Sequence, residues 1–444
     1  MSDHYSPDVL KSLAAERGVS QAELDALYLA LNGKSIDEIA QTFGITSIAV
    51  RKRLGEVYRK FEIQGKGPGK LEALKRVLEI KCQTTSEPDK IRQDWGDAPD
   101  VSVFYGREKE LQELQKWIVD DCCRLVALVG LRGIGKTALT VKLVKTVQEE
   151  FDFFIWRSLR NYQNISEFLD DVIQFLCQNQ KPNETERVNE KISLLIQLLR
   201  EHRCLLVIDE METVMRSGTR LGRYKKEFWE YGDFLREVAE QKHNSCIFIC
   251  SQEKPKEVLA KESPTANVRL YNLKGLEPEA AEKIFIHKGL KSSHKYGELI
   301  EGYKGNPLRL GGLATTIKNL FNGNVQEFNR NITLILRDTD ISNFERVFEE
   351  LSNTEKEIAH CLATQKEALS FPDLSNKIAK NSSNRNLVVG TSEIGKALES
   401  LESRLLLEVK RCEKDDNIPT IYSLEPFFKK FVYKKCLKNI LENE

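Results

Sequence analysis

Eight residues, Gly130 to Thr137, have the types and spacing that hold phosphate groups. They match the pattern G-x-x-x-x-G-K-[ST] within VALVGLRGIGKTAL (Val126–Leu139), where an apolar strand is expected before them and a helix after them. Glycines let backbone N–H groups turn inward, and the first turn of a helix presents its positive end to an anion. In this pattern Lys136 reaches the β- and γ-phosphates and Thr137 ligates Mg²⁺.

A second segment supplies carboxylates that suit the same chemistry. The apolar run CLLVID ends at Asp209, and Glu210 follows it. A carboxylate at the end of a buried strand can hold Mg²⁺ beside a phosphate loop. Glu210 could orient or deprotonate an attacking water, or it could be a bystander. Lys136, Asp209 and Glu210 are therefore the candidate catalytic residues, and Thr137 and Asp209 are the candidate metal ligands.

The elements that must position these residues alternate along the chain. The expected strands are RLVALVG, DFFIWRSL, CLLVIDE, CIFIC and Val268–Leu273, and the expected helices between them include TALTVKLVKTVQEEF, SEFLDDVIQFLC and ISLLIQLLREH. This alternation predicts an α/β fold, a parallel sheet with helices on both faces. The chain after Glu277 is expected to be mostly helical, with a small strand pair around LLLEVKR and TIYSL.

Composition narrows the possible partners and location. The 67 basic and 67 acidic residues cancel, so any attraction to nucleic acid must come from a local patch. The ten cysteines and six histidines show no zinc-like spacing. No run approaches 18 apolar residues and no leader pattern opens the chain, so we expect a cytoplasmic protein that does not contact a membrane.

The amino-terminal residues have the layout of an all-α helix-turn-helix domain. A first helix ends at Asn32-Gly33, Ser35 can cap the helix IDEIAQTF, Gly44 makes the turn, and Thr46 can cap a helix from Ser47 to about Phe61. Apolar side chains at helical spacing are expected to pack the three helices together: Ile36, Ile39, Ala40, Phe43, Ile45, Val50, Leu54, Val57 and Phe61.

Local charge favours DNA as the partner of residues 21–81. From Lys34 to Lys81, eleven Lys and Arg face six Asp and Glu, a net charge of +5 in a neutral chain. The stretch resembles the LuxR-type (GerE-like) DNA-binding domain, with Leu71 to Ile80 as a fourth helix. That resemblance implies DNA contacts by Ser47, Arg51, Lys52, Arg59 and Lys60. The alternative is a small helical adaptor for a protein partner, with the basic residues as a solvated face.

Four ordered motifs in the rest of the chain resemble the NB-ARC branch of the STAND class of signal-transduction NTPases. They are VFYGREKEL (Val103–Leu111), GIGKTAL, KGNPLRL (Lys304–Leu310) and CSQEKPKEV after the CIFIC strand. The resemblance implies an ATP/ADP site with Mg²⁺, in which Gly106 and Arg107 lie near the adenine and ribose and Pro307 caps the base. The implied nucleotide-binding set is Gly106, Arg107, Gly130, Gly133, Ile134, Gly135, Lys136, Thr137, Ala138 and Pro307.

With that family in view, five segments are expected. They are a helix-turn-helix domain (1–82), a linker (83–102), a P-loop NTPase domain (103–275), a helical domain (276–338) and a winged-helix domain (339–444) that folds over the nucleotide. The resemblance also implies a slow ATPase that switches between a closed ADP-bound monomer and an open ATP-bound oligomer.

Two departures from the family pattern affect this expectation. Gln252 replaces the arginine of the sensor strand, and a neutral amide cannot clamp a γ-phosphate as a charged fork does. Ser423, Leu424 and Glu425 stand where relatives carry Met-His-Asp, so the histidine that locks ADP is absent. We therefore expect the off state to be held by other groups. Relatives usually append repeats that sense a ligand, and this chain ends soon after the expected winged helix.

Three functions remain open at this stage. The first is a nucleotide-controlled transcriptional regulator in which assembly of the switch raises the avidity of DNA binding. The second is a signalling or defence scaffold whose amino-terminal domain recruits a protein effector or sensor partner. The third is a steady ATPase with another output.

Overall fold

The computed structural model describes residues 17–31, 33–61, 63, 70–71, 74, 92–177, 187–215, 224–263, 266–291, 296–331, 334–383, 390–411 and 419–441. The chain divides into two compact units, residues 1–90 and 91–444, and each is described separately. The predicted fourth helix (71–80) and the first part of the predicted linker (83–91) fall largely outside the described residues.

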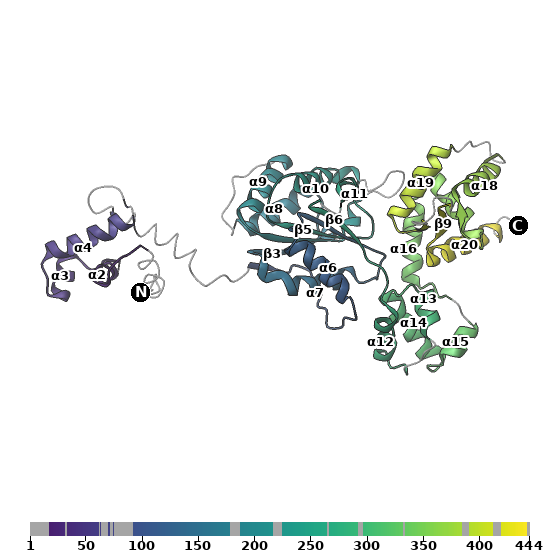
Figure 1. Cartoon of the computed structure of the whole chain (residues 1–444), viewed down its shortest axis with the longest axis horizontal. Helices are drawn as coiled ribbons and strands as arrows, with labels where there is room; N and C mark the ends of the chain where they lie inside the picture. Colours follow the sequence, from purple (N-terminus) through teal and green to yellow (C-terminus); the bar gives the residue numbers. More distant parts are fainter. Residues whose placement is uncertain are drawn as a thin grey trace. The chain divides into compact units, whose positions relative to one another are not determined.

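Three helices form the described part of the first unit: α2 (Gln21–Leu31), α3 (Ile36–Phe43) and α4 (Ser47–Lys60) (Figure 1). Ser35 caps α3 in a capping box with Glu38, because each side chain bonds the other residue's backbone amide. Gly44 ends α3 in the left-handed conformation, with φ 62°. The Thr46 side chain then caps α4. These bounds agree with those the sequence predicts.

The three helices share an apolar core. Ile39, Val50 and Val57 are fully buried there, and Ala40, Leu54 and Phe61 are nearly so. Ile36, Phe43 and Ile45 are partly buried and pack against the same cluster. The predicted core of this unit is therefore confirmed.

The second unit is built on a six-stranded parallel sheet with the order β1-β3-β4-β5-β2-β6. The strands are β1 (Arg92–Asp94), β2 (Leu125–Val129), β3 (Phe153–Ser158), β4 (Cys204–Asp209), β5 (Cys246–Ser251) and β6 (Val268–Asn272). Every residue of β2, β3, β4 and β5 is buried, as expected for strands covered on both faces.

Helices cover both faces of this sheet (Figure 1). One face packs against α8 (Ile165–Leu176), α9 (Val188–Glu201), α10 (Glu230–Glu240) and α11 (Lys256–Lys261), and the other against α6 (Glu108–Val119) and α7 (Lys136–Val147). Neighbouring residues of one strand go to opposite faces: Leu125 and Ala127 join the first layer, and Val126 and Leu128 the second. The predicted α/β fold class is confirmed.

The sequence prediction was wrong at the end of the expected linker. Arg92–Asp94 forms β1, an edge strand paired in parallel with β3. Its three residues are polar and mostly exposed, so no apolar pattern marks it. Ion pairs to a buried arginine hold it instead, because Arg157 of β3 bonds both Asp94, at 2.6 Å, and the partly exposed Asp171 of α8.

Residues 276–441 are mostly helical. The helices are α12 (Pro278–His287), α13 (Tyr296–Gly302), α14 (Pro307–Leu320), α15 (Val325–Asn331), α16 (Asp338–Glu349), α17 (Asn353–Thr364), α18 (Phe371–Ser383), α19 (Thr391–Ser403) and α20 (Pro426–Leu441). The strands β7 (Leu369–Ser370), β9 (Ile421–Leu424) and β8 (Leu407–Lys410) form an antiparallel sheet in that order, which includes the predicted strand pair.

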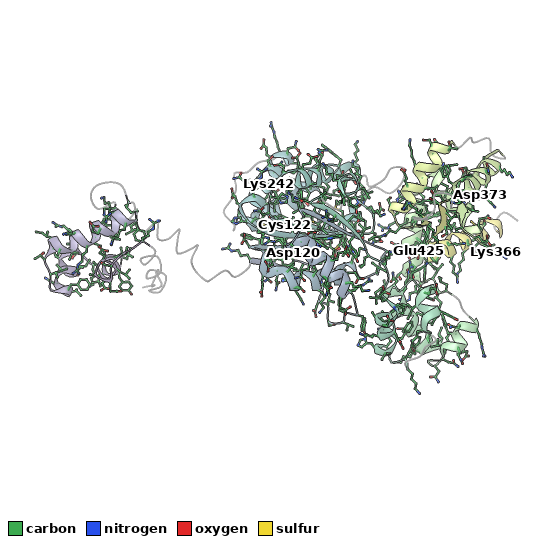
Figure 2. All side chains as sticks on the ribbon, viewed as in Figure 1. Asp120, Cys122, Lys242, Lys366, Asp373 and Glu425 are labelled. Carbon is green, nitrogen blue, oxygen red and sulfur yellow. The ribbon has the colours of Figure 1, made fainter. Side chains whose placement is uncertain are left out.

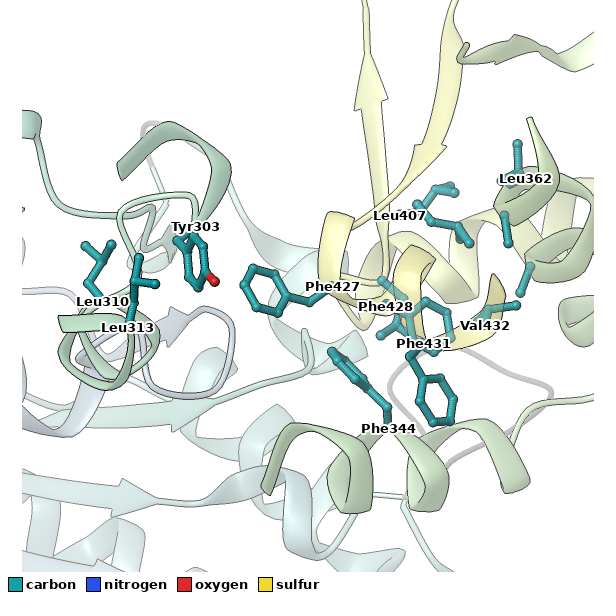
Figure 3. Close-up of a cluster of buried hydrophobic side chains, with 14 of the residues drawn as sticks. Tyr303, Leu310, Leu313, Phe344, Leu362, Leu407, Phe427, Phe428, Phe431 and Val432 are labelled. Atoms are coloured by element: carbon teal, nitrogen blue, oxygen red, sulfur yellow. The ribbon is translucent and has the colours of Figure 1, made fainter. Parts of the chain in front are cut away.

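One continuous apolar core joins the predicted helical domain to the region after it (Figure 3). The ring of Phe427 on α20 lies 5.1 Å from that of Tyr303, at the end of α13, in an edge-to-face contact. Phe428 on the same helix lies 5.4 Å from Phe344 on α16. Because α20 packs in two directions, it couples α13 and α14 to the carboxyl-terminal region.

None of the described helices is both long enough and apolar enough to cross a bilayer.

Candidate nucleotide-binding site

The loop between β2 and α7 presents unpaired backbone donors. Gly133 and Gly135 have positive φ angles of 74° and 104°, which turn the chain sharply before α7. Within the described residues, the amides of Gly133 and Gly135 make no backbone hydrogen bond. The first amides of α7 also lack an intrahelical acceptor, as at any helix start. The loop is therefore a concave set of donors suited to an anion.

The two polar side chains that close the motif are held in place. The Lys136 ammonium donates to the carbonyl oxygens of Gly130, at 2.9 Å, and Leu131, at 3.3 Å. Burial lowers the pKa of Lys136, and the nearby carboxylates of Glu212 and Asp209 oppose that shift. Bonds to the loop carbonyls keep the cation beside the donors of the loop, where a phosphate would meet both.

The side chains of Thr137 and Asp209 are hydrogen-bonded to each other, although the two residues follow different strands. The Thr137 hydroxyl donates to Asp209 Oδ2 at 3.0 Å, although β5 lies between the strands that lead to the two residues. Burial raises the pKa of Asp209 to about 6, against the lowering effect of the bonds from the Glu210 amide and Thr137. A divalent cation would offset the cost of this buried carboxylate.

The residues present fit Mg²⁺ in a particular way. In the described part of the chain no three His, Cys, Asp or Glu side chains cluster as a metal cage. Mg²⁺ usually keeps several waters and takes one or two protein ligands together with substrate phosphates. The pair Thr137 and Asp209 beside the phosphate loop matches that donor set.

Glu210 points its carboxylate at β3 and the residues after it. It adopts the left-handed conformation, with φ 58°. Its carboxylate accepts the Ser158 hydroxyl at 2.7 Å and forms an ion pair with Arg160. The structure thus places Glu210 next to Asp209 but engages it with two partners.

Glu212 is a site residue that the sequence analysis missed. It lies in the short 3-10 helix Met211–Thr213. Its carboxylate accepts the Gln252 backbone amide at 3.1 Å and the Gln252 side-chain amide at 2.6 Å. The signal for it was the third carboxylate in VIDEME, directly after the metal-directed aspartate. Gln252 thus ties the end of β5 to the acidic segment.

A cavity of about 500 Å³ extends from the phosphate loop between the segment before α6 and the helices α12 and α14. It is lined by Val103, Phe104, Tyr105, Arg107, Ile134, Gly135, Ala138, Leu276, Ile284, His287, Lys288, Pro307, Leu308, Gly311, Gly312, Thr315 and Arg337. The Tyr105 hydroxyl is buried without a hydrogen-bond partner in the described structure. A mostly apolar cleft of this size with few polar groups suits a small molecule such as a nucleotide.

The amino terminus of α14 rests directly on the phosphate loop. The Leu308 amide donates to the Gly133 carbonyl at 3.3 Å, and a Cβ on Gly133 would lie 2.5 Å from the Leu308 side chain. The buried Asn306 caps α14 and donates to the Arg132 carbonyl at 3.0 Å. Pro307, the first residue of α14, therefore lies on the cavity wall beside the loop.

The segment before α6 forms the wall of the cavity opposite α14. Gly106 has φ 61°, and a Cβ there would lie 2.7 Å from the Ala280 side chain. The Arg107 guanidinium bonds Glu110 and the carbonyl oxygens of Ile134 and Lys274, at 2.6, 3.2 and 2.7 Å. Arg107 therefore fastens the phosphate loop to the chain before α12.

Two hydrogen bonds, among other contacts, join the carboxyl-terminal region to the residues around the phosphate loop. The Lys254 amide, after β5, donates to the Ser403 carbonyl at 3.2 Å. Glu425, labelled in Figure 2, precedes α20 and accepts the Arg309 guanidinium of α14 at 2.6 Å. That guanidinium also lies 3.7 Å from the Phe427 ring. Glu425 therefore lies at the end of the segment 423–425, which lacks the locking histidine, and makes a buried ion pair there.

The five candidate DNA-contacting residues of the first unit differ in availability. Arg51 and Lys52 are exposed on α4 and have no ion-pair or hydrogen-bond partner in the described structure. Ser47 donates to Asp37, Arg59 pairs with Glu56, and Lys60 pairs with Glu23, all within the unit. Ile48, which the sequence analysis did not select, is 76% exposed beside Arg51 and Lys52.

Comparison with known proteins agrees with the geometry of the second unit. Residues 107–216 match the model of the NB-ARC domain. A curated "Uncharacterized WD repeat-containing protein" of Nostoc sp. is 35% identical over 75% of this chain and 27% of its own length. A "Probable disease resistance protein" of Arabidopsis thaliana is 23% identical over 26% of this chain and 16% of its own length. The chain thus spans about a quarter or less of these relatives.

Among solved structures, one similar chain is the STAND protein with a tetratricopeptide repeat sensor from Pyrococcus horikoshii. It is 19% identical, covers 77% of this chain and is itself covered over 44%, with a TM-score of 0.39. The family match shows that residues 107–216 are similar to the NB-ARC domain. The parallel sheet, with its phosphate loop between β2 and α7, has the fold of P-loop NTPases.

Proposed function

We propose that this chain is an ATP/ADP switch whose nucleotide state controls self-association and DNA binding. In this proposal residues 103–275 bind the nucleotide, residues 276–338 and 339–444 close over it, and residues 1–82 are the output domain. The observation that carries it is the contact of Thr137 with Asp209 beside the free loop amides, at the mouth of a cavity of about 500 Å³.

In this proposal different residues bind the phosphates, the nucleoside and Mg²⁺. The loop amides and Lys136 receive the phosphates, and Gly106, Ile134, Ala138 and Pro307 enclose the nucleoside. Thr137 and Asp209 would hold Mg²⁺, which when bound neutralises phosphate charge. Glu210 would position the water for slow hydrolysis once Ser158 and Arg160 release it.

The closed state is held by contacts that replace the absent histidine. Arg309 on α14 bonds Glu425 before α20, so the helix that touches the phosphate loop is tied to the carboxyl-terminal region. Gln252 makes its bonds to Glu212 instead of projecting a charge toward a γ-phosphate. Opening of these contacts on nucleotide exchange would expose surfaces for self-association.

The exposed side chains of α4 support a DNA-binding output. Arg51 and Lys52 are free to approach phosphates or bases, and Ile48 could contact a thymine methyl group. One small domain of this kind binds weakly, and assembly of several copies raises avidity through effective concentration.

A scaffold that recruits a protein effector is the second candidate function. The 76% exposure of Ile48 favours it, because an exposed apolar side chain among charges also suits a protein interface. The curated relatives support it as well, since one is named for WD repeats and the other for disease resistance.

Calorimetric titration of ADP and ATP into the chain, with and without Mg²⁺, tests the nucleotide site. We expect saturable binding at one site, which Lys136→Ala weakens at least tenfold. Asp209→Ala should remove only the part of the affinity that depends on Mg²⁺. A Lys242→Ala control, at an exposed lysine remote from the loop, should bind like the wild type. Equal affinity in all four proteins would refute the site.

Turnover separates the switch from a steady ATPase. We expect phosphate release at or below about one per minute, far under the enzyme median of ~10 s⁻¹. Rapid turnover without self-association would refute the switch.

A further inference from the structure

Arg337 is a charged residue in the wall of the cavity to which neither the motifs nor the NB-ARC match assigns a role. It immediately precedes α16, the helix that leads from the helical domain into the carboxyl-terminal region. It lines the cavity of about 500 Å³ together with Gly312 and Thr315 of α14. Its guanidinium packs against α14 at Gly312, where an added Cβ would be 1.5 Å from a guanidinium nitrogen. Glycine at 312 therefore admits this side chain.

The guanidinium of Arg337 lacks the acceptors that three buried arginines of the second unit, Arg107, Arg157 and Arg309, have. Arg107 bonds Glu110, Arg157 bonds Asp94 and Asp171, and Arg309 bonds Glu425. In the described structure the Arg337 guanidinium has no hydrogen bond or ion pair, and only its backbone amide bonds Asp340. Arg337 is partly buried in the cavity wall, and its unpaired guanidinium offers hydrogen-bond donors to a ligand that enters the cavity.

The position along α14 indicates which part of a nucleotide would supply the acceptor. Leu308, in the first turn of α14, contacts the phosphate loop at Gly133. Gly312 lies four residues further along the helix, a rise of about 6 Å. Arg337 therefore faces the cavity beyond the phosphates, where the ribose and base would lie.

We propose that Arg337 binds the nucleoside part of the nucleotide, by donating to ring nitrogens of the base or to ribose oxygens. This inference rests on the proposed function, because it takes the cavity as the nucleotide site. Since Arg337 adjoins α16, the contact also links occupancy of the cavity to the carboxyl-terminal region. Through this contact the bound nucleoside connects α14, which lines the cavity, to α16.

Two variants test the contact by different routes. Arg337→Ala removes the guanidinium, whereas Gly312→Ala keeps it and displaces it with a methyl group inside α14, where alanine itself favours the helix. Gly297→Ala on α13 is the matched control, because a Cβ there meets nothing within 4 Å. Each protein is titrated calorimetrically with ADP, AMP and inorganic pyrophosphate, and its thermal unfolding midpoint is measured without ligand.

We expect Arg337→Ala and Gly312→Ala to weaken ADP and AMP binding about tenfold or more, the effect of losing hydrogen bonds to a charged group. Pyrophosphate binding should remain that of the wild type, and Gly297→Ala should match the wild type throughout. Loss of pyrophosphate affinity as well would place the contact at the phosphates and overturn the nucleoside assignment.

Unchanged ADP and AMP affinity in both variants, with or without a lower unfolding midpoint, would overturn the inference and leave Arg337 a structural residue. That result is distinguishable from failure of the proposed function. If the wild type bound no ADP and matched Lys136→Ala, the nucleotide site and this inference would both fall.

Discussion

Asp209 is the residue whose ionisation should control metal-dependent binding. Burial raises its pKa to about 6, so the free protein increasingly protonates this carboxyl below that pH. A proton at Asp209 competes with Mg²⁺ for the same oxygens. We expect the Mg²⁺-dependent part of ADP affinity to fall as pH drops from 7.5 to 5, by up to tenfold per pH unit below about 6.

Calorimetry at pH 5, 6 and 7.5 checks this prediction, with Asp209→Asn as the control. The terminal phosphate of ADP ionises near pH 6 as well, and the asparagine variant retains that effect while removing the protein's. The prediction fails if wild type and Asp209→Asn show the same pH dependence.

Glu253 should make the stability of the folded chain depend on pH. Burial raises its pKa to about 7, and the charges of Arg404, Glu212 and Glu350 adjust that value. A carboxyl with a raised folded-state pKa contributes stability below its unfolded value near 4.5, and that contribution is lost as pH rises through 7.

We therefore expect Glu253→Gln to be more stable than the wild type at pH 8, by on the order of 2 kcal/mol, with the difference nearly gone at pH 5. Thermal unfolding at the two pH values measures it. A glutamine variant that is equally stable at pH 8, or less so, would show that Glu253 is ionised without cost.

At the scale of elements, α14 links the phosphate loop to α20. Its first turn bonds Gly133, and its Arg309 bonds Glu425 inside the protein, where both side chains are under a tenth exposed. Removing one partner of such a pair leaves an unpaired buried charge, which costs on the order of 3–5 kcal/mol. The pair therefore makes the closed arrangement sensitive to either residue.

We expect Arg309→Met and Glu425→Gln each to lower the unfolding free energy substantially, and the double variant to cost clearly less than the sum of the two. A double-mutant cycle on thermal unfolding measures that coupling. Additive losses would mean that the two residues act independently, and the ion pair would then not hold the closed state.

Local patterns in the sequence predicted most elements. Fully apolar runs such as CLLVID and CIFIC marked the buried parallel strands, and Ser35, Gly44 and Thr46 marked the ends of short helices, because capping depends on neighbouring residues. The sequence did not predict the edge strand β1, because this strand is polar and is held by a distant arginine, Arg157.

The sequence predicted the site residues that belong to one local motif. It did not predict contacts between segments that are far apart in the chain. Gly130 to Thr137 form a local loop, and Asp209 ends an apolar strand. In contrast, Glu425 bonds Arg309 from 116 positions away, and Glu212 gained its place only through the bond to Gln252. Such pairings depend on tertiary packing that no local spacing encodes.

At the scale of the whole molecule, the proposed nucleotide site lies in one compact unit and the exposed basic residues of α4 lie in the other. Nucleotide state can govern DNA binding only if it changes assembly or the availability of α4. The central claim is therefore a coupling between two binding events, which linkage requires to be reciprocal.

The most direct measurement is fluorescence anisotropy of mixed-sequence duplex DNA titrated with the whole chain, in ADP or ATP with Mg²⁺, across salt concentration. We predict salt-sensitive binding that ATP tightens and that Arg51→Glu/Lys52→Glu abolishes. A matched charge reversal at exposed lysines of the second unit, Lys242→Glu/Lys366→Glu, should retain binding. No binding in either nucleotide, or binding indifferent to both nucleotide and the Arg51/Lys52 reversal, would contradict the account and favour the protein scaffold.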